Sequence, residues 1–130
     1  IKMKTTYSKI ELYNIAGILS DGLGGVFLIL LASFIYPLLG FSFSGVYEYV
    51  VFAFVSLTGI IHYMALKNPS SQVLLMNLTV IIRVFASSVF FALFANGKLG
   101  FEALAICLFD LSFVFVYLVY FYQKEFLCKD

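Results

Sequence analysis

Four long apolar runs dominate this chain of 130 residues, and each is long enough to cross a lipid bilayer as a helix. A hydrocarbon core about 30 Å thick needs about 20 apolar residues in helical form. The runs cover residues 12–39, 47–66, 73–94 and 103–122. Apolar residues are continuous within them, unlike the alternating pattern of a membrane β-barrel. We therefore expect an all-α integral membrane protein with four transmembrane helices.

The composition excludes the water-soluble classes of protein. Hydrophobic residues make up 63% of the chain and charged residues 12%, whereas an ordinary globular protein has roughly 45–50% apolar and about 25% charged residues. A soluble chain of this size would lack the polar side chains needed to cover its surface. The formal net charge of +1 gives no general attraction to nucleic acid. We expect membrane lipid as the surroundings and no nucleic-acid partner.

Short segments rich in turn-forming residues separate the four runs. They cover residues 40–45, 67–71 and 96–100, and the middle one contains Pro69, which ends a helix. Connections this short make each helix antiparallel to its neighbour in sequence. The chain is thus predicted to form one domain, an up-down-up-down four-helix bundle over residues 1–130.

The lysines predict the orientation of this bundle. One side holds Lys2, Lys4, Lys9, Lys67, Lys124 and Lys129, and the other holds Lys98. Because cytoplasmic loops carry the excess of positive charge, both termini are predicted to be cytoplasmic. The first apolar run is too long for a signal peptide and has no cleavage site after it, so we expect it to be retained as a span.

Three charged side chains lie deep within the predicted spans: Asp21, Arg83 and Asp110. At 1.5 Å per residue they lie about 13, 15 and 18 Å from the cytoplasmic ends of their helices, which is a similar level. A planar guanidinium can bind two carboxylates, so we expect the three to converge on the bundle axis. If all were ionised, one negative charge would remain in excess, and one aspartate is therefore expected to hold a proton or face a cation.

Polar or small residues accompany each of the three charges, and also His62 in the second span, at helical spacing, so they share a face with it. The four predicted faces are Gly17, Ser20, Asp21, Gly24 and Gly25; Ser56, Gly59, His62 and Tyr63; Thr79, Arg83 and Ser87; and Cys107, Asp110 and Tyr117. A polar path from the cytoplasm to the charges would pass Asn14, His62 and Asn77. The predicted ligand- or ion-binding residues are Asp21, His62, Asn77, Arg83, Asp110 and Tyr117.

Each of these features also has a purely structural interpretation. The buried charges can be a clasp that fixes helix register, and His62 can be a hydrogen-bonding group near a helix end. The glycines between residues 22 and 25 favour close helix packing, and the alternative is a local break beside Asp21 that makes an ion site. A single histidine and the absence of C-x-x-C predict no metal site, and we expect no cofactor.

The segment GIIHYMALKNP at residues 59–69 follows a glycine-rich first span that ends at Pro37 and Gly40. In these features the chain resembles small bacterial DoxX-like four-helix membrane proteins. The resemblance implies a four-span layout in a bacterial inner (cell) membrane, and it carries over no functional residues.

Three functions remain open at this point. The polar core can bind a small or amphipathic ligand or a partner subunit. It can instead serve a small proton- or cation-coupled transporter or channel, as a homodimer because four spans enclose a narrow interior. The chain can also be an accessory subunit of a larger membrane complex. Enzymatic action on a lipid is not expected, because Asp21, Asp110 and His62 match no catalytic spacing, and we predict no catalytic residues.

Overall fold

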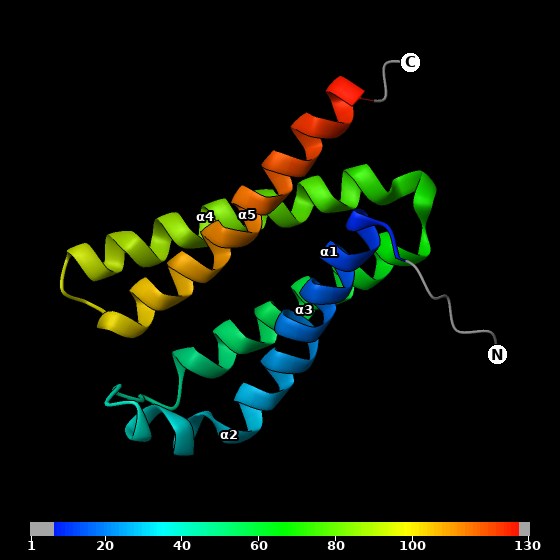
Figure 1. Ribbon diagram of the computed structural model, residues 1–130. Helices are drawn as coiled ribbons and strands as arrows, with labels where there is room; N and C mark the ends of the chain where they lie inside the picture. The colour runs from blue at the N-terminus through cyan, green and yellow to red at the C-terminus, as the bar shows by residue number, and fades with distance from the viewer. Residues whose placement is uncertain (1–6, 128–130) are drawn as a thin grey trace. The chain divides into compact units, whose positions relative to one another are not determined.

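The computed structural model describes the backbone of residues 7–127 and the side chains of residues 7–120, and all its regular elements are helices. In chain order they are α1 (Lys9–Gly17), η1 (Ile18–Leu23), α2 (Gly24–Leu38), α3 (Tyr47–Lys67), η2 (Pro69–Ser71), α4 (Gln72–Ala95) and α5 (Phe101–Leu127), as Figure 1 shows. The element η1 is a π-helical turn between α1 and α2, and η2 is a 3₁₀ turn that begins at Pro69. The predicted all-α class is confirmed for these residues.

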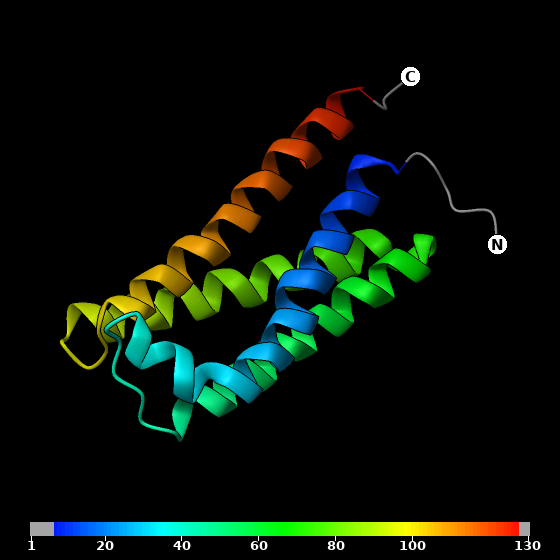
Figure 2. The same ribbon diagram turned by 60° about the horizontal axis from the view of Figure 1, so that its bottom comes forward.

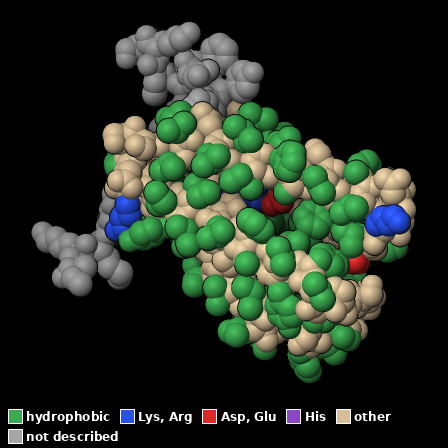
Figure 3. Space-filling model, turned by 180° about the vertical axis from the view of Figure 1, so that it is seen from behind, with side chains coloured by type: hydrophobic (Ala, Val, Ile, Leu, Met, Phe, Trp, Pro, Cys, Tyr) green, Lys and Arg blue, Asp and Glu red, His purple; other side chains and the backbone are tan. Residues whose placement is uncertain are grey.

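Four helical segments are long and apolar enough to cross a membrane. They are Lys9–Leu38, Tyr47–Lys67, Pro69–Ala95 and Phe101–Tyr120, which agree with the predicted spans to within a few residues. Only 17–28% of the apolar window of each segment is buried inside the molecule. Leu30, Leu74 and Phe85 are 71–72% exposed, and hydrophobic side chains cover most of the face in Figure 3. Surfaces of this kind mark membrane or protein contacts.

The chain divides into two compact units. The first consists of the described residues up to Ile35 together with Phe43–Met76, and the second consists of Tyr36–Ser42 and the described residues from Asn77 onward. The boundaries fall within α2, within the loop before α3 and within α4. The single domain that the sequence predicts stays a prediction.

In the first unit, α1 and η1 lie along α3 (Figures 1 and 2). Gly17 is next to the ring of His62, and Gly22 is next to Gly59. Residue numbers therefore rise along one segment as they fall along the other. A Cβ atom on Gly59 would lie 2.3 Å from Gly22, and Cβ atoms on Gly17 and Gly25 would lie 2.3 and 2.4 Å from His62 and Ser56, so the close approach explains part of the glycine content of both segments.

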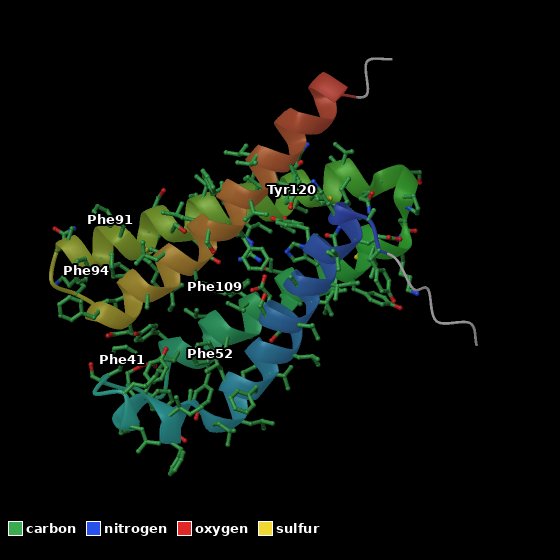
Figure 4. The ribbon with its side chains drawn as sticks, viewed as in Figure 1. Phe41, Phe52, Phe91, Phe94, Phe109 and Tyr120 are labelled. Carbon is green, nitrogen blue, oxygen red and sulfur yellow. The ribbon has the colours of Figure 1, made fainter. Side chains whose placement is uncertain are left out.

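In the second unit, side chains of α4 between residues 77 and 94 contact side chains of α5 between residues 101 and 117. The rings of Phe94 and Phe101 lie 5.8 Å apart between centroids, next to the loop that joins the two helices, and Figure 4 labels Phe94 there. Further along, the thiol of Cys107 donates to the carbonyl oxygen of Ser87 at 3.2 Å. The numbers again rise on one helix as they fall on the other.

Two glycines end helices in the way that the turn segments predict. Gly97 has φ +68°, and the amide groups of Gly97 and Lys98 donate to the carbonyl oxygens of Phe94 and Leu93. Gly40, with φ +75°, ends α2 by the same pattern of hydrogen bonds. This arrangement, with a left-handed residue just after the helix, is strongly favoured by glycine.

Several residues that the orientation depends on lie outside the described part. Lys2, Lys4 and Lys129 are outside the described residues, and the side chain of Lys124 is outside them too. The prediction that both termini are cytoplasmic stays a prediction.

Candidate functional site

The first unit contains a buried cluster of three polar side chains, Asn14, His62 and Asp21, which we call the His62 cluster. Asn14 and His62 are 0% exposed and Asp21 is 2% exposed. The Nδ1 atom of His62 lies 3.0 Å from Oδ1 of Asn14, and Nε2 lies 3.9 Å from Oδ2 of Asp21. The imidazole thus contacts an amide through one nitrogen and faces a carboxylate through the other.

Small and aromatic neighbours from α1 fix the position of the His62 ring. A Cβ atom placed on Gly17 would lie 2.3 Å from Cδ2 of His62, so only glycine leaves room for the imidazole at this point. The ring of Tyr13 meets it edge-on, with centroids 5.5 Å apart and an angle of 67° between the planes. The sequence predicts His62 on an interior face, and its complete burial agrees with that prediction.

Asp21 lies within the π-helical turn η1. Such turns are rare inside α-helices and occur frequently at functional sites. The sequence leaves open a local break beside Asp21 and close packing of the neighbouring glycines. The helix is widened at Ile18–Leu23 but is not interrupted, and Gly22 and Gly25 pack directly against α3. Close packing is therefore observed, together with a departure from α-helical geometry at Asp21.

The amide group of Asn14 is held by contacts of its own. Its Nδ2 atom donates to the carbonyl oxygen of Ile10 at 3.1 Å and approaches Sδ of Met76 at 3.5 Å. Because Nδ2 is used in this way, Oδ1 faces His62. The sequence predicts Asn14 only as a step on a polar path. Its direct contact with His62, 48 positions further along the chain, is not predicted by the sequence.

The second unit contains a buried ion pair between α4 and α5. The Nη1 atom of Arg83 donates to Oδ1 of Asp110 at 2.6 Å, and the side chains are 2% and 17% exposed. The guanidinium carbon lies 4.1 Å from the centroid of the Phe113 ring, so the aromatic face covers it. A charge-assisted bond and a cation–π contact together hold this arginine in place.

Two further predicted residues meet one turn or more away from this pair. The hydroxyl of Tyr117 donates to Oδ1 of Asn77. Tyr117 is 4% exposed, whereas Asn77 is exposed on α4. Tyr63, which the sequence places on the same inward face as His62, is 51% exposed, so that assignment is wrong. Its position one residue after His62 turns it by about 100° around the helix axis.

The predicted set is thus found as three contacts. Arg83 meets Asp110 and Tyr117 meets Asn77 in the second unit, and Asp21 faces His62 in the first. The convergence of Asp21 with Arg83 and Asp110 concerns both units and stays a prediction.

Glu48, which the sequence analysis misses, is a further buried acid, and it has several partners. It is 1% exposed, and its carboxylate accepts hydrogen bonds from the amide and hydroxyl of Ser44 at 2.6 and 2.5 Å and from the amide of Gly45 at 3.1 Å. Its place in the first turn of α3 also suits the positive end of the helix dipole. We assign it to the anchoring of the loop before α3.

Comparisons with protein-family models, with curated proteins and with solved structures found no match.

The described side chains include no group of three or more His, Cys, Asp or Glu residues that could hold a metal ion.

Proposed function

We propose that this chain is a small integral membrane protein that carries protons across the bilayer, as a proton-coupled transporter or a channel, through Asp21 and His62. Its four apolar helices would form an antiparallel up-down-up-down bundle in a bacterial inner membrane, with both termini in the cytoplasm. Because four spans enclose a narrow interior, the working form would be a homodimer or would join a larger membrane complex.

The observation that carries this proposal is the His62 cluster. Ionisable residues inside a membrane are costly, and chains of Asp, Glu and His serve as proton relays in pumps and transporters. Here an imidazole and a carboxylate face each other at 3.9 Å, and both are buried. Histidine is the side chain that ordinarily changes charge near neutral pH. The cluster also coincides with a π-helical turn, which is a second feature typical of functional sites.

The Arg83–Asp110 pair has the features of a clasp. The two charges neutralise each other at 2.6 Å, and Phe113 covers the guanidinium. We therefore assign this pair to the pairing of α4 with α5, and we place the functional site at His62.

Proton movement can be tested with purified protein in liposomes. The liposomes carry a pH-sensitive dye, and a potassium gradient with valinomycin drives protons inward. The wild type should acidify the interior faster than protein-free liposomes, and Asp21→Asn should return the rate to the protein-free level. Ser88→Ala, which removes an exposed hydroxyl on α4, is the matched control and should keep the wild-type rate. Wild-type protein that moves no protons would refute the proposal.

Binding of a small amphipathic ligand is the second candidate function. The observation that favours it is Ser87, which is 4% exposed and lies one turn from Arg83. Its hydroxyl has no hydrogen-bond partner among the described residues, and a buried polar group without a partner costs about 1–3 kcal/mol. A ligand carboxylate could accept from that hydroxyl. Decanoate should then raise the thermal stability of the protein, and a rise that survives both Ser87→Ala and Arg83→Ala unchanged would exclude this site.

A further inference from the structure

The contacts of Asn14 determine which nitrogen of His62 carries its proton. Nδ2 of Asn14 is directed to the carbonyl oxygen of Ile10 and to Sδ of Met76, so the amide presents Oδ1, an acceptor, to the imidazole. The 3.0 Å contact between Oδ1 and Nδ1 of His62 is then a hydrogen bond only if Nδ1 bears hydrogen. In the neutral ring this leaves Nε2 with a lone pair.

That lone pair faces Oδ2 of Asp21 at 3.9 Å. If Asp21 were ionised and His62 neutral, two acceptors would face each other in a buried site, which is unfavourable. One proton removes the conflict, either as imidazolium beside carboxylate or as neutral imidazole beside carboxylic acid. In the exchange between these forms, the O–H bond of Asp21 breaks as the N–H bond at Nε2 forms, and the total charge of the pair is unchanged.

We propose that Asn14 is a positioning residue, which holds neutral His62 in the Nδ1–H form so that Nε2 is the atom that exchanges a single proton with Asp21. This inference rests on the proposed function, because it names the atoms of the same site. The 3.9 Å separation exceeds hydrogen-bond length, so exchange requires rotation of the Asp21 side chain or one bridging water. Two titratable groups of the first unit lie against the ring: the carboxylate of Asp21 on η1 faces Nε2, and the ring of Tyr13 on α1 meets the imidazole edge-on.

The protein is well suited to a direct test, because His62 is its single histidine. Selective ¹⁵N-histidine labelling gives NMR signals from one imidazole, and the shifts of its two nitrogens identify the protonated one. At a pH where the ring is neutral, the wild type should show hydrogen on Nδ1. Asn14→Leu removes the acceptor and should lower the ratio of the Nδ1–H to the Nε2–H form by roughly threefold to tenfold, as expected for one lost hydrogen bond.

Two variants separate positioning from general damage to the fold. Asn14→Asp keeps an oxygen acceptor and should restore the Nδ1–H form. Thr58→Val changes a buried hydroxyl one turn from His62 whose hydrogen bond goes to the carbonyl oxygen of Phe54, and it should leave the ratio unchanged. If Asn14→Leu does not fold, the wild-type spectrum alone decides.

The inference is overturned if neutral wild-type His62 carries its hydrogen on Nε2, or if folded Asn14→Leu keeps the wild-type ratio. This result is independent of proton flux. An Nδ1–H ring in a protein that moves no protons would remove the proposed function and keep the role of Asn14. Proton flux in a protein whose neutral His62 carries hydrogen on Nε2 would keep the proposed function and remove the role of Asn14.

Discussion

Replacement of Gly59 by alanine should separate η1 from α3, and the structure gives the size of the effect. A Cβ atom on Gly59 would lie 2.3 Å from both Cα and N of Gly22, whereas ordinary contact is 3.4–4 Å. To restore ordinary contact, the backbones of η1 and α3 would have to move apart by about 1.1–1.7 Å. Both clashing atoms belong to the main chain, so no side-chain rotation can relieve the overlap.

The energy follows from two opposing terms. Overpacking costs about 1–3 kcal/mol, and the rigid contact places this case at the upper end. Alanine gains about 1 kcal/mol over glycine in a helix interior. We therefore expect Gly59→Ala to lower the free energy of unfolding by about 2 kcal/mol.

The other side of the same contact supplies the control. A Cβ atom on Gly22 would lie 3.7 Å from Cα of Gly59, which is ordinary contact, so Gly22→Ala should be neutral or stabilising. Denaturant unfolding in mild detergent, followed by the near-ultraviolet circular dichroism of the tyrosines, measures both variants. Equal stability of the wild type and Gly59→Ala, or an equal loss in both variants, would refute the close approach of these helices.

Two further predictions concern the other buried charges. Asp110→Leu removes the carboxylate that Arg83 contacts at 2.6 Å and should destabilise the protein by up to about 3–5 kcal/mol. The double variant with Arg83→Met should recover most of this loss. Thermal unfolding of the four proteins tests this, and a double variant as unstable as the single one would argue against the clasp. Glu48→Ala removes the acceptor for Ser44 and Gly45 and should cost about 1.5–3 kcal/mol, while Glu48→Gln, which keeps one oxygen, should lose less. Equal thermal stability of Glu48→Ala and the wild type would show that the loop is anchored by other contacts.

The helices could be predicted from the sequence because their signals are local. Continuous apolar runs set the span lengths, and Pro69 and Gly97 each mark a helix end, since α3 ends at Lys67 and α4 at Ala95. The contact of Arg83 with Asp110 could also be predicted, because the rise of 1.5 Å per residue places the two side chains at a similar depth on neighbouring helices.

The His62 cluster could be predicted only in part. Burial of His62 and Asp21 follows from helical spacing, but their separation depends on how the two helices are rotated about their axes. The π-helical turn at Ile18–Leu23 changes that rotation and has no residue pattern that distinguishes it from an α-helix. The contact of Asn14 with His62 depends in the same way on how α1 and α3 are rotated, and the sequence places the two residues only on a common polar path.

Glu48 was missed for a different reason. Its partners Ser44 and Gly45 belong to the loop, and the loop conformation that aims their donors at the carboxylate is set by the chain as a whole. The four-residue separation from Ser44 is a local signal that would have found one of these bonds.

A double-variant cycle in proteoliposomes tests the central claim, that Asp21 and His62 act together as one proton site. Proton influx is measured at equal protein density for the wild type, Asp21→Asn, His62→Gln and the double variant. If the two side chains share one proton, each single change abolishes influx and the double variant is no worse than either. Wild-type influx in either single variant, with the protein folded, would show that protons do not pass through this pair.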